Sequence, residues 1–233
     1  MDETRRGDFT RRYFLWSGAA ALALPACGRA AIPYDATPQP MALASGFPQM
    51  PTGGEGVTPC GSFRPPSVIP HVGRIAPASE PGQPIEIEGV VWRGDRQTLA
   101  SDIVIFAYHT DTHGLYNHPN SPFNPRLYGW IKTDAQGQYK FRTVKPAPYP
   151  QLDTPAHIHV NLFGPGIPEY WVDDYWFAGD PLITPSQRSH LTGRGGGGET
   201  LHLVRGSDGV SRARRDFVLQ HVRVNGGCRL LKA

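Results

Sequence analysis

The stretch Ile85-Glu86-Ile87-Glu88-Gly89-Val90-Val91 alternates apolar and polar residues, as a β-strand with one buried face does. A second run, Ile103-Val104-Ile105-Phe106-Ala107-Tyr108, is β-branched and aromatic and predicts another strand. Residues 127–133 and 138–144 predict a hairpin, because the turn residues Asp134-Ala135-Gln136-Gly137 separate them. The fold is therefore expected to be built from short strands joined by tight turns.

Further strands follow at 157–163, 201–204 and 215–219, and the glycine run 195–198 predicts a mobile loop. The chain has 233 residues with 39% hydrophobic residues, which allows one good core. Its 27 Gly and 24 Pro argue against a helical protein. We predict an all-β fold, an antiparallel β-sandwich with long irregular loops, over residues 80–233.

A formal charge of only +3 gives no indication of nucleic-acid binding.

Residues 1–32 have the pattern of an export signal. Arg11 and Arg12 precede the apolar stretch 15–26, which is short for a membrane span and resembles a twin-arginine-type signal. Such signals carry folded proteins, often with a cofactor already inserted. Leu24-Pro25-Ala26-Cys27 can also be a lipoprotein cleavage box, with lipid on Cys27 as the alternative to simple cleavage. We expect an exported protein, either periplasmic or anchored to the cell-envelope membrane.

Residues 33–79 are rich in Pro and Gly and predict an extended arm without a core of its own. Without Cys27, the cysteines left are Cys60 and Cys228, an even number in an oxidising compartment. One disulfide between them and two free thiols are both compatible with the sequence. The sequence leaves the oligomeric state open, and a homo-oligomer is compatible with it.

His157 and His159 stand on one predicted strand, two residues apart, so both side chains leave the same face. Two imidazoles on one face can share a metal ion. Pro148-Tyr149-Pro150 holds a tyrosine in a rigid turn shortly before that strand, and Tyr116 lies in the long loop after the strand 103–108. Phenolate oxygens are hard anionic ligands that suit Fe(III), and coordination must supply the stabilisation that keeps them deprotonated. These residues predict a single ferric site.

The ordered motifs of residues 133–159, with Phe163-Gly164-Pro165-Gly166 and Phe177-Ala178-Gly179-Asp180-Pro181, resemble the intradiol ring-cleavage dioxygenases. The last two motifs resemble the protocatechuate branch in particular. The resemblance covers roughly residues 84–220. It also favours that branch because the chain lacks an N-terminal helical domain of the kind found in the catechol and hydroxyquinol dioxygenases.

The resemblance implies a β-sandwich that binds one mononuclear non-haem Fe(III) ion through Tyr116, Tyr149, His157 and His159. It implies a catecholic substrate, attack of O2 on the ring and opening between the two hydroxylated carbons to a muconate-type diacid. Tyr149 matches the ligand that leaves when substrate chelates the iron. In that reading the metal is the Lewis acid and the template.

Two positions depart from the family pattern. Thr154 stands where the family has an arginine, whose charge stabilises the ring as it gains carbanion character. Arg126 or Arg142 can replace this charge from another strand, although Arg142 can equally be a solvated surface residue. Asp173-Asp174 stands where the family has Thr-Gln, which predicts an acidic pocket wall and disfavours an anionic substrate such as protocatechuate.

Two other readings remain open at the level of sequence. One is a cupin-like, zinc or Fe(II) site built from His157, His159 and the histidines of the preceding loop, which are His109, His113 and His118. The other is an exported binding module that keeps the fold and has lost activity, for which Thr154 is the main support.

Overall fold

The structure is a computed structural model that describes residues 65–118 and 121–220. The chain divides into two units, residues 1–40 and 41–233, and the described residues all belong to the second. Cys27, Cys60 and Cys228 lie outside the described residues, as do the predicted signal and most of the predicted arm, so the predictions for them stay predictions. Within the described ranges, no helix is long and apolar enough to cross a membrane.

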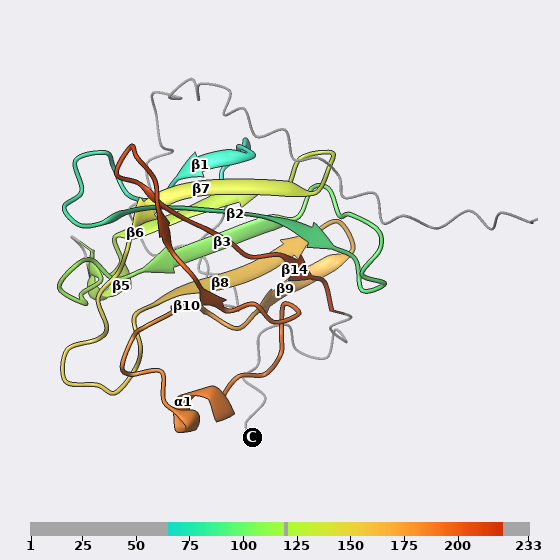
Figure 1. Cartoon of the computed structure of the whole chain (residues 1–233). Coiled ribbons are helices and arrows are strands. Elements are labelled where there is room, and N and C mark those ends of the chain that lie inside the picture. The colour runs from blue at the N-terminus through green and yellow to red at the C-terminus, as the bar shows by residue number, and fades with distance from the viewer. Residues whose placement is uncertain (1–64, 119–120, 221–233) are drawn as a thin grey trace, which may run out of the picture. The chain divides into compact units, whose positions relative to one another are not determined.

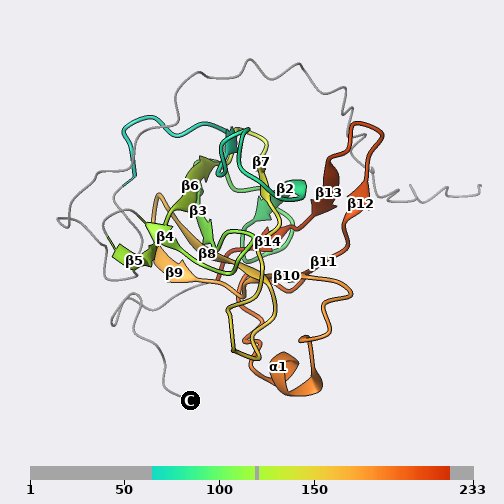
Figure 2. The ribbon, with the colours of Figure 1, turned by 90° about the vertical axis from the view of Figure 1, so that its left-hand side faces the viewer.

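Two six-stranded sheets form the fold (Figures 1 and 2). The first sheet has the order β1 (Val72–Arg74), β7 (Gln138–Val144), β2 (Pro84–Trp92), β13 (Ser211–Arg214), β12 (Val204–Arg205), and β14 (Phe217–Val218) also pairs with β2. The second has the order β11 (Thr200–Leu201), β10 (Tyr175–Phe177), β8 (His157–Gly164), β3 (Val104–His109), β6 (Leu127–Lys132), and β9 (Ile167–Trp171) also pairs with β8. A two-stranded ribbon of β4 (Asn117–His118) and β5 (Ser121–Pro125) and one short helix, α1 (Pro185–Ser189), complete the described elements.

The core lies between the two sheets, and alternation along each strand decides which residues enter it. Ile85 and Ile87 of β2 and Phe141 of β7 contribute to the core from the first sheet, and all three are fully buried. Ile105 of β3 and Ile158 of β8 contribute from the second. Burial of such side chains is the main favourable term in folding. The predicted all-β sandwich is confirmed.

The sequence predicted an antiparallel sandwich, and the sheets are mixed. The central pairs β2–β7, β3–β6 and β3–β8 are antiparallel, but β1–β7, β13–β2, β14–β2 and β10–β11 are parallel. Strand direction depends on how distant segments return to a sheet, which local alternation does not encode.

Two segments differ from their predicted form. The strand predicted at 201–204 is divided, because Leu201 pairs with the second sheet and Val204 with the first. The strand predicted at 215–219 is interrupted where the Asp216 side chain, instead of a backbone carbonyl, accepts the Val90 N–H at 3.0 Å. Gly195, the first residue of the glycine run, accepts a backbone hydrogen bond from Val218 N–H at 2.9 Å.

The predicted boundary at residue 80 is too late. Residues 72–74 of the predicted arm form β1 and pair with β7. Ile75 and Ala76 are 5% and 1% exposed and belong to the core. The sandwich therefore includes the last part of the segment assigned to the arm.

Candidate metal centre

β8 presents its two histidines on the side that faces away from the core. Ile158, Val160 and Leu162 point into the core, so His157 and His159 leave the opposite face. Their Nε2 atoms lie 3.0 Å apart. The predicted same-face arrangement is present, and it is close enough for both nitrogens to contact one ion.

The two tyrosines reach this pair from separate loops. Tyr149 lies between β7 and β8, and its Oη is 3.0 Å from Nε2 of His159 and 3.2 Å from Nε2 of His157. Tyr116 lies between β3 and β4, and its Oη is in hydrogen-bond contact with Oη of Tyr149. Four donor atoms from residues spread over the sequence thus converge at one point.

The hydrogen bonds around the imidazoles turn both Nε2 lone pairs toward that point. Nδ1 of His157 donates to the Pro155 carbonyl at 2.7 Å, and Nδ1 of His159 donates to Oδ1 of Asp174 at 3.1 Å. Two lone pairs 3.0 Å apart repel each other unless a proton or a cation lies between them. With two phenol oxygens beside them, the donor set fits a hard trivalent cation such as Fe(III).

Burial favours the uncharged form of His157 and of both tyrosines. It lowers the pKa of His157, an effect that the neighbouring His159 increases, so the imidazole is neutral and able to ligate at neutral pH. It raises the pKa of both Tyr116 and Tyr149, so neither phenol loses its proton unaided. A cation at the cluster supplies the positive charge that phenolate formation needs.

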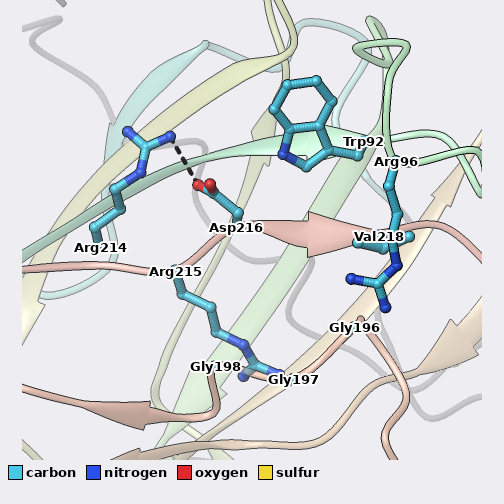
Figure 3. Close-up of a pocket in the computed structure, with 9 residues that line it drawn as sticks. All are labelled: Trp92, Arg96, Gly196, Gly197, Gly198, Arg214, Arg215, Asp216 and Val218. Carbon is cyan, nitrogen blue, oxygen red and sulfur yellow. Dashed lines mark ion pairs between the residues drawn. The ribbon is translucent and has the colours of Figure 1, made fainter. Parts of the chain in front are cut away.

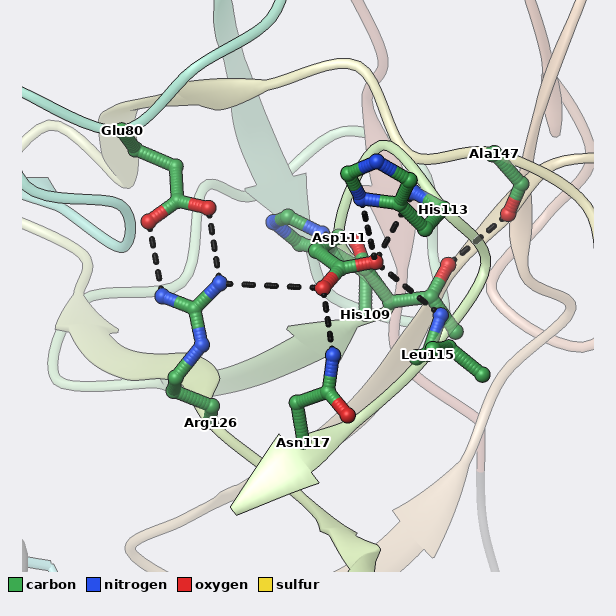
Figure 4. Close-up of polar contacts among 9 residues, drawn as sticks. Glu80, His109, Asp111, His113, Leu115, Asn117, Arg126 and Ala147 are labelled. Carbon is green, nitrogen blue, oxygen red and sulfur yellow. Dashed lines mark hydrogen bonds and ion pairs between the residues drawn. The ribbon is translucent and has the colours of Figure 1, made fainter. Parts of the chain in front are cut away.

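A hydrogen-bond network fixes the loop that carries Tyr116 (Figure 4). Asp111 Oδ1 accepts from the backbone N–H groups of His113 and Leu115 at 2.9 and 3.1 Å, and its Oδ2 accepts from Asn117 at 2.8 Å. The Asp111 carbonyl accepts from Ala147 N at 3.1 Å, which ties this loop to the one that carries Tyr149. The two tyrosine loops are therefore held to each other near the metal centre.

Arg126 and Glu80 extend this network. Arg126 donates two hydrogen bonds to Glu80, at 2.7 and 2.8 Å, and lies 3.9 Å from Asp111. Its backbone N–H donates to the Tyr116 carbonyl at 2.9 Å. Arg142, in turn, pairs with Glu86 on the neighbouring strand. Both guanidinium groups are thus engaged by carboxylates, and these contacts do not support the hypothesis that either one replaces the family arginine at the ring.

We expect Glu80→Gln to lower the free energy of unfolding by about 1–2 kcal/mol at pH 7. The substitution removes the negative charge that accepts two hydrogen bonds from Arg126. Arg126 lowers the pKa of Glu80 in the folded chain below the ordinary value of 4.5. That contribution is therefore fully present above about pH 4.5 and is lost as the pH falls through the folded pKa. Urea unfolding at pH 7 and pH 3 should show the difference between variant and wild type shrinking in acid.

The matched control is Asp102→Asn. The Asp102 side chain is 57% exposed, and its carboxylate lies 3.1 Å from Lys132. An exposed pair of this kind contributes less than about 1 kcal/mol. An equal loss of unfolding free energy in Glu80→Gln at pH 7 and pH 3 would contradict a stabilising charged pair between Glu80 and Arg126.

Asp173 and Asp174 each accept hydrogen bonds from another residue of the chain. Asp173 is 9% exposed and accepts from N and Oγ1 of Thr192 at 2.9 and 2.7 Å. Asp174 accepts from His159. The sequence indicates Asp174 only as a pocket-wall residue, and its contact with His159 was not predicted because it depends on the pairing of β10 with β8.

Within the described part of the chain, the loop histidines do not form the alternative zinc cluster. His109 is 1% exposed, and both of its ring nitrogens lie 2.6 Å from oxygen atoms, the Thr110 carbonyl and Oγ1 of Thr143. Burial lowers its pKa to about 4, so it is a neutral structural residue. The side chain of His113 is 78% exposed, and that of His118 lies outside the described residues.

A separate pocket of about 470 Å³ is lined by the glycine run and three arginines (Figure 3). Arg214 pairs with Asp216 at 2.8 Å, and Arg96 also reaches this pocket. Arg215 is 2% exposed, with its guanidinium packed against the rings of Tyr175 and Phe217. The pocket contains none of the four donor residues and is distinct from the metal centre.

The fold is a β-sandwich that brings two histidines and two tyrosines together at one point. Residues 71–192 match the family model described as Dioxygenase. The match spans more than half of the chain and includes all four donors. The chain therefore belongs to the intradiol dioxygenase family.

Curated relatives agree with this assignment. The protocatechuate 3,4-dioxygenase beta chain of Burkholderia cepacia is 33% identical over 91 residues, which are 34% of this chain and 39% of that protein. Catechol 1,2-dioxygenase 2 of Acinetobacter lwoffii is 30% identical over 145 residues, 49% of this chain and 52% of that one. Chlorocatechol 1,2-dioxygenase of Pseudomonas putida is 32% identical over 169 residues, 59% of this chain and 57% of that one. The chain thus spans about half of the length of the curated relatives that it matches.

Solved structures support the fold. A dioxygenase domain from Streptomyces sp. SirexAA-E superposes with a TM-score of 0.50 at 24% identity, covering 68% of this chain and 92% of that one. Catechol 1,2-dioxygenase from Pseudomonas arvilla C-1 gives a TM-score of 0.53 at 21% identity, covering 75% and 65% of the two chains. At this level of identity the likeness concerns the fold alone.

Proposed function

We propose that this protein is a Fe(III)-dependent intradiol dioxygenase that opens a catecholic ring with O2 between the two hydroxylated carbons and yields a muconate-type diacid. The observation that carries the proposal is the convergence of two phenol oxygens with two imidazole nitrogens whose lone pairs face each other at 3.0 Å. The curated relatives are named as dioxygenases of catechol, chlorocatechol and protocatechuate. Within this class, a catechol is the proposed substrate.

His157, His159, Tyr116 and Tyr149 would hold the ferric ion. When bound, that ion would supply Lewis acidity and a template, drawing electron density from a chelated catecholate so that O2 attacks the ring. The chain's own contribution is to keep both Nε2 atoms directed at one point, through the Pro155 carbonyl and the Asp174 carboxylate.

Tyr149 is the residue proposed to take the proton from the incoming catechol. Among the four donor residues, the Oη of Tyr149 contacts the other three, and the Oη of Tyr116 contacts Tyr149. Burial raises the pKa of Tyr149, and a phenolate with a raised pKa is a stronger base. Once released as a ligand, it would accept and hold the substrate's proton at Oη.

We further propose that ring cleavage is slower here than in family members that carry the arginine. Thr154 has no charge to offer, and the two arginines considered as substitutes are paired with Glu80 and Glu86. Loss of such an electrostatic contribution typically costs a few kcal/mol of transition-state stabilisation.

Oxygen uptake tests the proposed function. The iron-loaded chain is mixed in air with catechol, protocatechuate or hydroxyquinol, and O2 consumption is measured together with the ring-opened product. We expect one O2 per ring opened and, with ¹⁸O2, both labelled atoms in the diacid. Normal iron binding without O2 uptake on any of the three would overturn the dioxygenase assignment in favour of a binding module.

Residues 1–32 are proposed to act as a twin-arginine-type export signal, on the basis of Arg11 and Arg12 before an apolar stretch. The mature protein would then be periplasmic, or held on the cell-envelope membrane by lipid on Cys27. Mass spectrometry of the mature N-terminus from cell fractions distinguishes the two forms, and an intact residue 1 in both fractions would contradict export by cleavage.

A further inference from the structure

His159 and His157 differ in the group that each ring contacts on the side away from the cluster. Nδ1 of His157 donates to a neutral acceptor, the Pro155 carbonyl, at 2.7 Å. Nδ1 of His159 lies 3.1 Å from Oδ1 of Asp174, a carboxylate. A ring N–H that donates to an anion makes the opposite nitrogen more basic than one that donates to a carbonyl. The two histidines are therefore not equivalent donors.

The sheet register delivers Asp174 to this place. β10 pairs with β8 so that Tyr175 lies opposite Ile158 and Trp176 opposite His157. The residue before Tyr175 consequently lies beside His159, on the same face as its ring. The other side of the imidazole stacks on Tyr108, with ring centroids 4.6 Å apart. Tyr108 thus fixes the plane of the His159 ring, and Asp174 fixes its rotation within that plane.

We propose that Asp174 is a positioning residue of the metal centre: it accepts Nδ1–H of His159, keeps Nε2 directed at the other donors, and makes His159 the stronger of the two imidazole ligands. This inference rests on the proposed function for the identity of the metal, and on the His159 geometry for everything else.

The test is Asp174→Asn, which keeps an oxygen acceptor of the same length and removes the charge. Its control is Asp173→Asn, since Asp173 is the adjacent carboxylate and its hydrogen bonds go to Thr192. In the metal-free chain, ¹⁵N NMR of the imidazoles reports the tautomer of His159. In the iron-loaded chain, the phenolate-to-Fe(III) absorption band and the affinity for Fe(III) report donor strength.

We expect wild type and Asp173→Asn to hold His159 with the proton on Nδ1, and Asp174→Asn to give a mixture of tautomers. The same variant should bind Fe(III) about 10- to 100-fold more weakly, with its absorption band moved to longer wavelength because a weaker imidazole donor leaves a more electron-poor iron. A purely structural role would leave the wavelength unchanged.

Two results would overturn the inference. One is a wild-type His159 protonated on Nε2, and the other is an Asp174→Asn variant with the wild-type band and affinity. Absence of any band in wild type would instead refute the ferric site of the proposed function, and the tautomer of His159 would then decide the inference alone.

Discussion

Replacing Tyr149 with phenylalanine should weaken and shift the visible absorption band of the iron-loaded protein and lower ring cleavage by about 100-fold or more. The side-chain oxygen removed is the one that contacts Tyr116, His157 and His159. General-base contributions of this kind are worth about 10²- to 10⁴-fold. A weaker band should remain, because Tyr116 still supplies one phenolate. The measurements are the visible spectrum after loading with Fe(III) and the rate of O2 uptake with catechol.

Tyr108→Phe is the control for this experiment. The Tyr108 ring stacks on His159, so phenylalanine keeps the stacking and removes only a hydroxyl that is outside the donor set. Its band should keep the wild-type position. If Tyr149→Phe also leaves the spectrum unchanged, the wrong tyrosine has been assigned.

Gly114→Ala should weaken iron binding by about tenfold or more and destabilise the fold. Gly114 has φ +77°, and a Cβ added there would lie 2.1 Å from the Pro148 carbonyl oxygen and 3.0 Å from Cδ of Pro150. Both contacts belong to the turn that carries Tyr149, so the added methyl must push the two tyrosine loops apart. A displacement of this kind disrupts the convergence of Tyr116 and Tyr149 on one ion. Fe(III) titration and urea unfolding measure the two effects.

Gly166→Ala is the matched control because Gly166 has φ +72° and nothing within 4 Å of an added Cβ. This variant should lose only the stability that backbone strain costs, about 1–2 kcal/mol, and bind iron as the wild type does. Equal iron affinity in both variants would show that the approach of the two loops does not matter for the site.

Local patterns in the sequence were sufficient to predict the central strands and the histidine pair. Alternation on β2 and β8 predicts which residues enter the core, and the two-residue spacing puts His157 and His159 on one face. The prolines around Tyr149 mark a rigid turn before β8. Each of these signals lies within a few residues of the group that it places.

The contacts that depend on long-range pairing could not be predicted in this way. Asp174 reaches His159 only through the register of β10 on β8, and Arg126 is held by Glu80, a partner 46 residues away. The buried guanidinium of Arg215 likewise depends on two rings from different sheets. Sequence alone therefore identified the candidate ligands but not the residues that orient them.

Titration of the metal-free protein with Fe(III), followed by visible absorption, tests the central claim most directly. Two phenolates on one ferric ion should produce a charge-transfer band that grows linearly and saturates at one iron per chain. Zinc should compete for the same site without producing colour. A protein that binds iron without this band, or that shows no saturation at one equivalent, would contradict a metal centre built from Tyr116, Tyr149, His157 and His159.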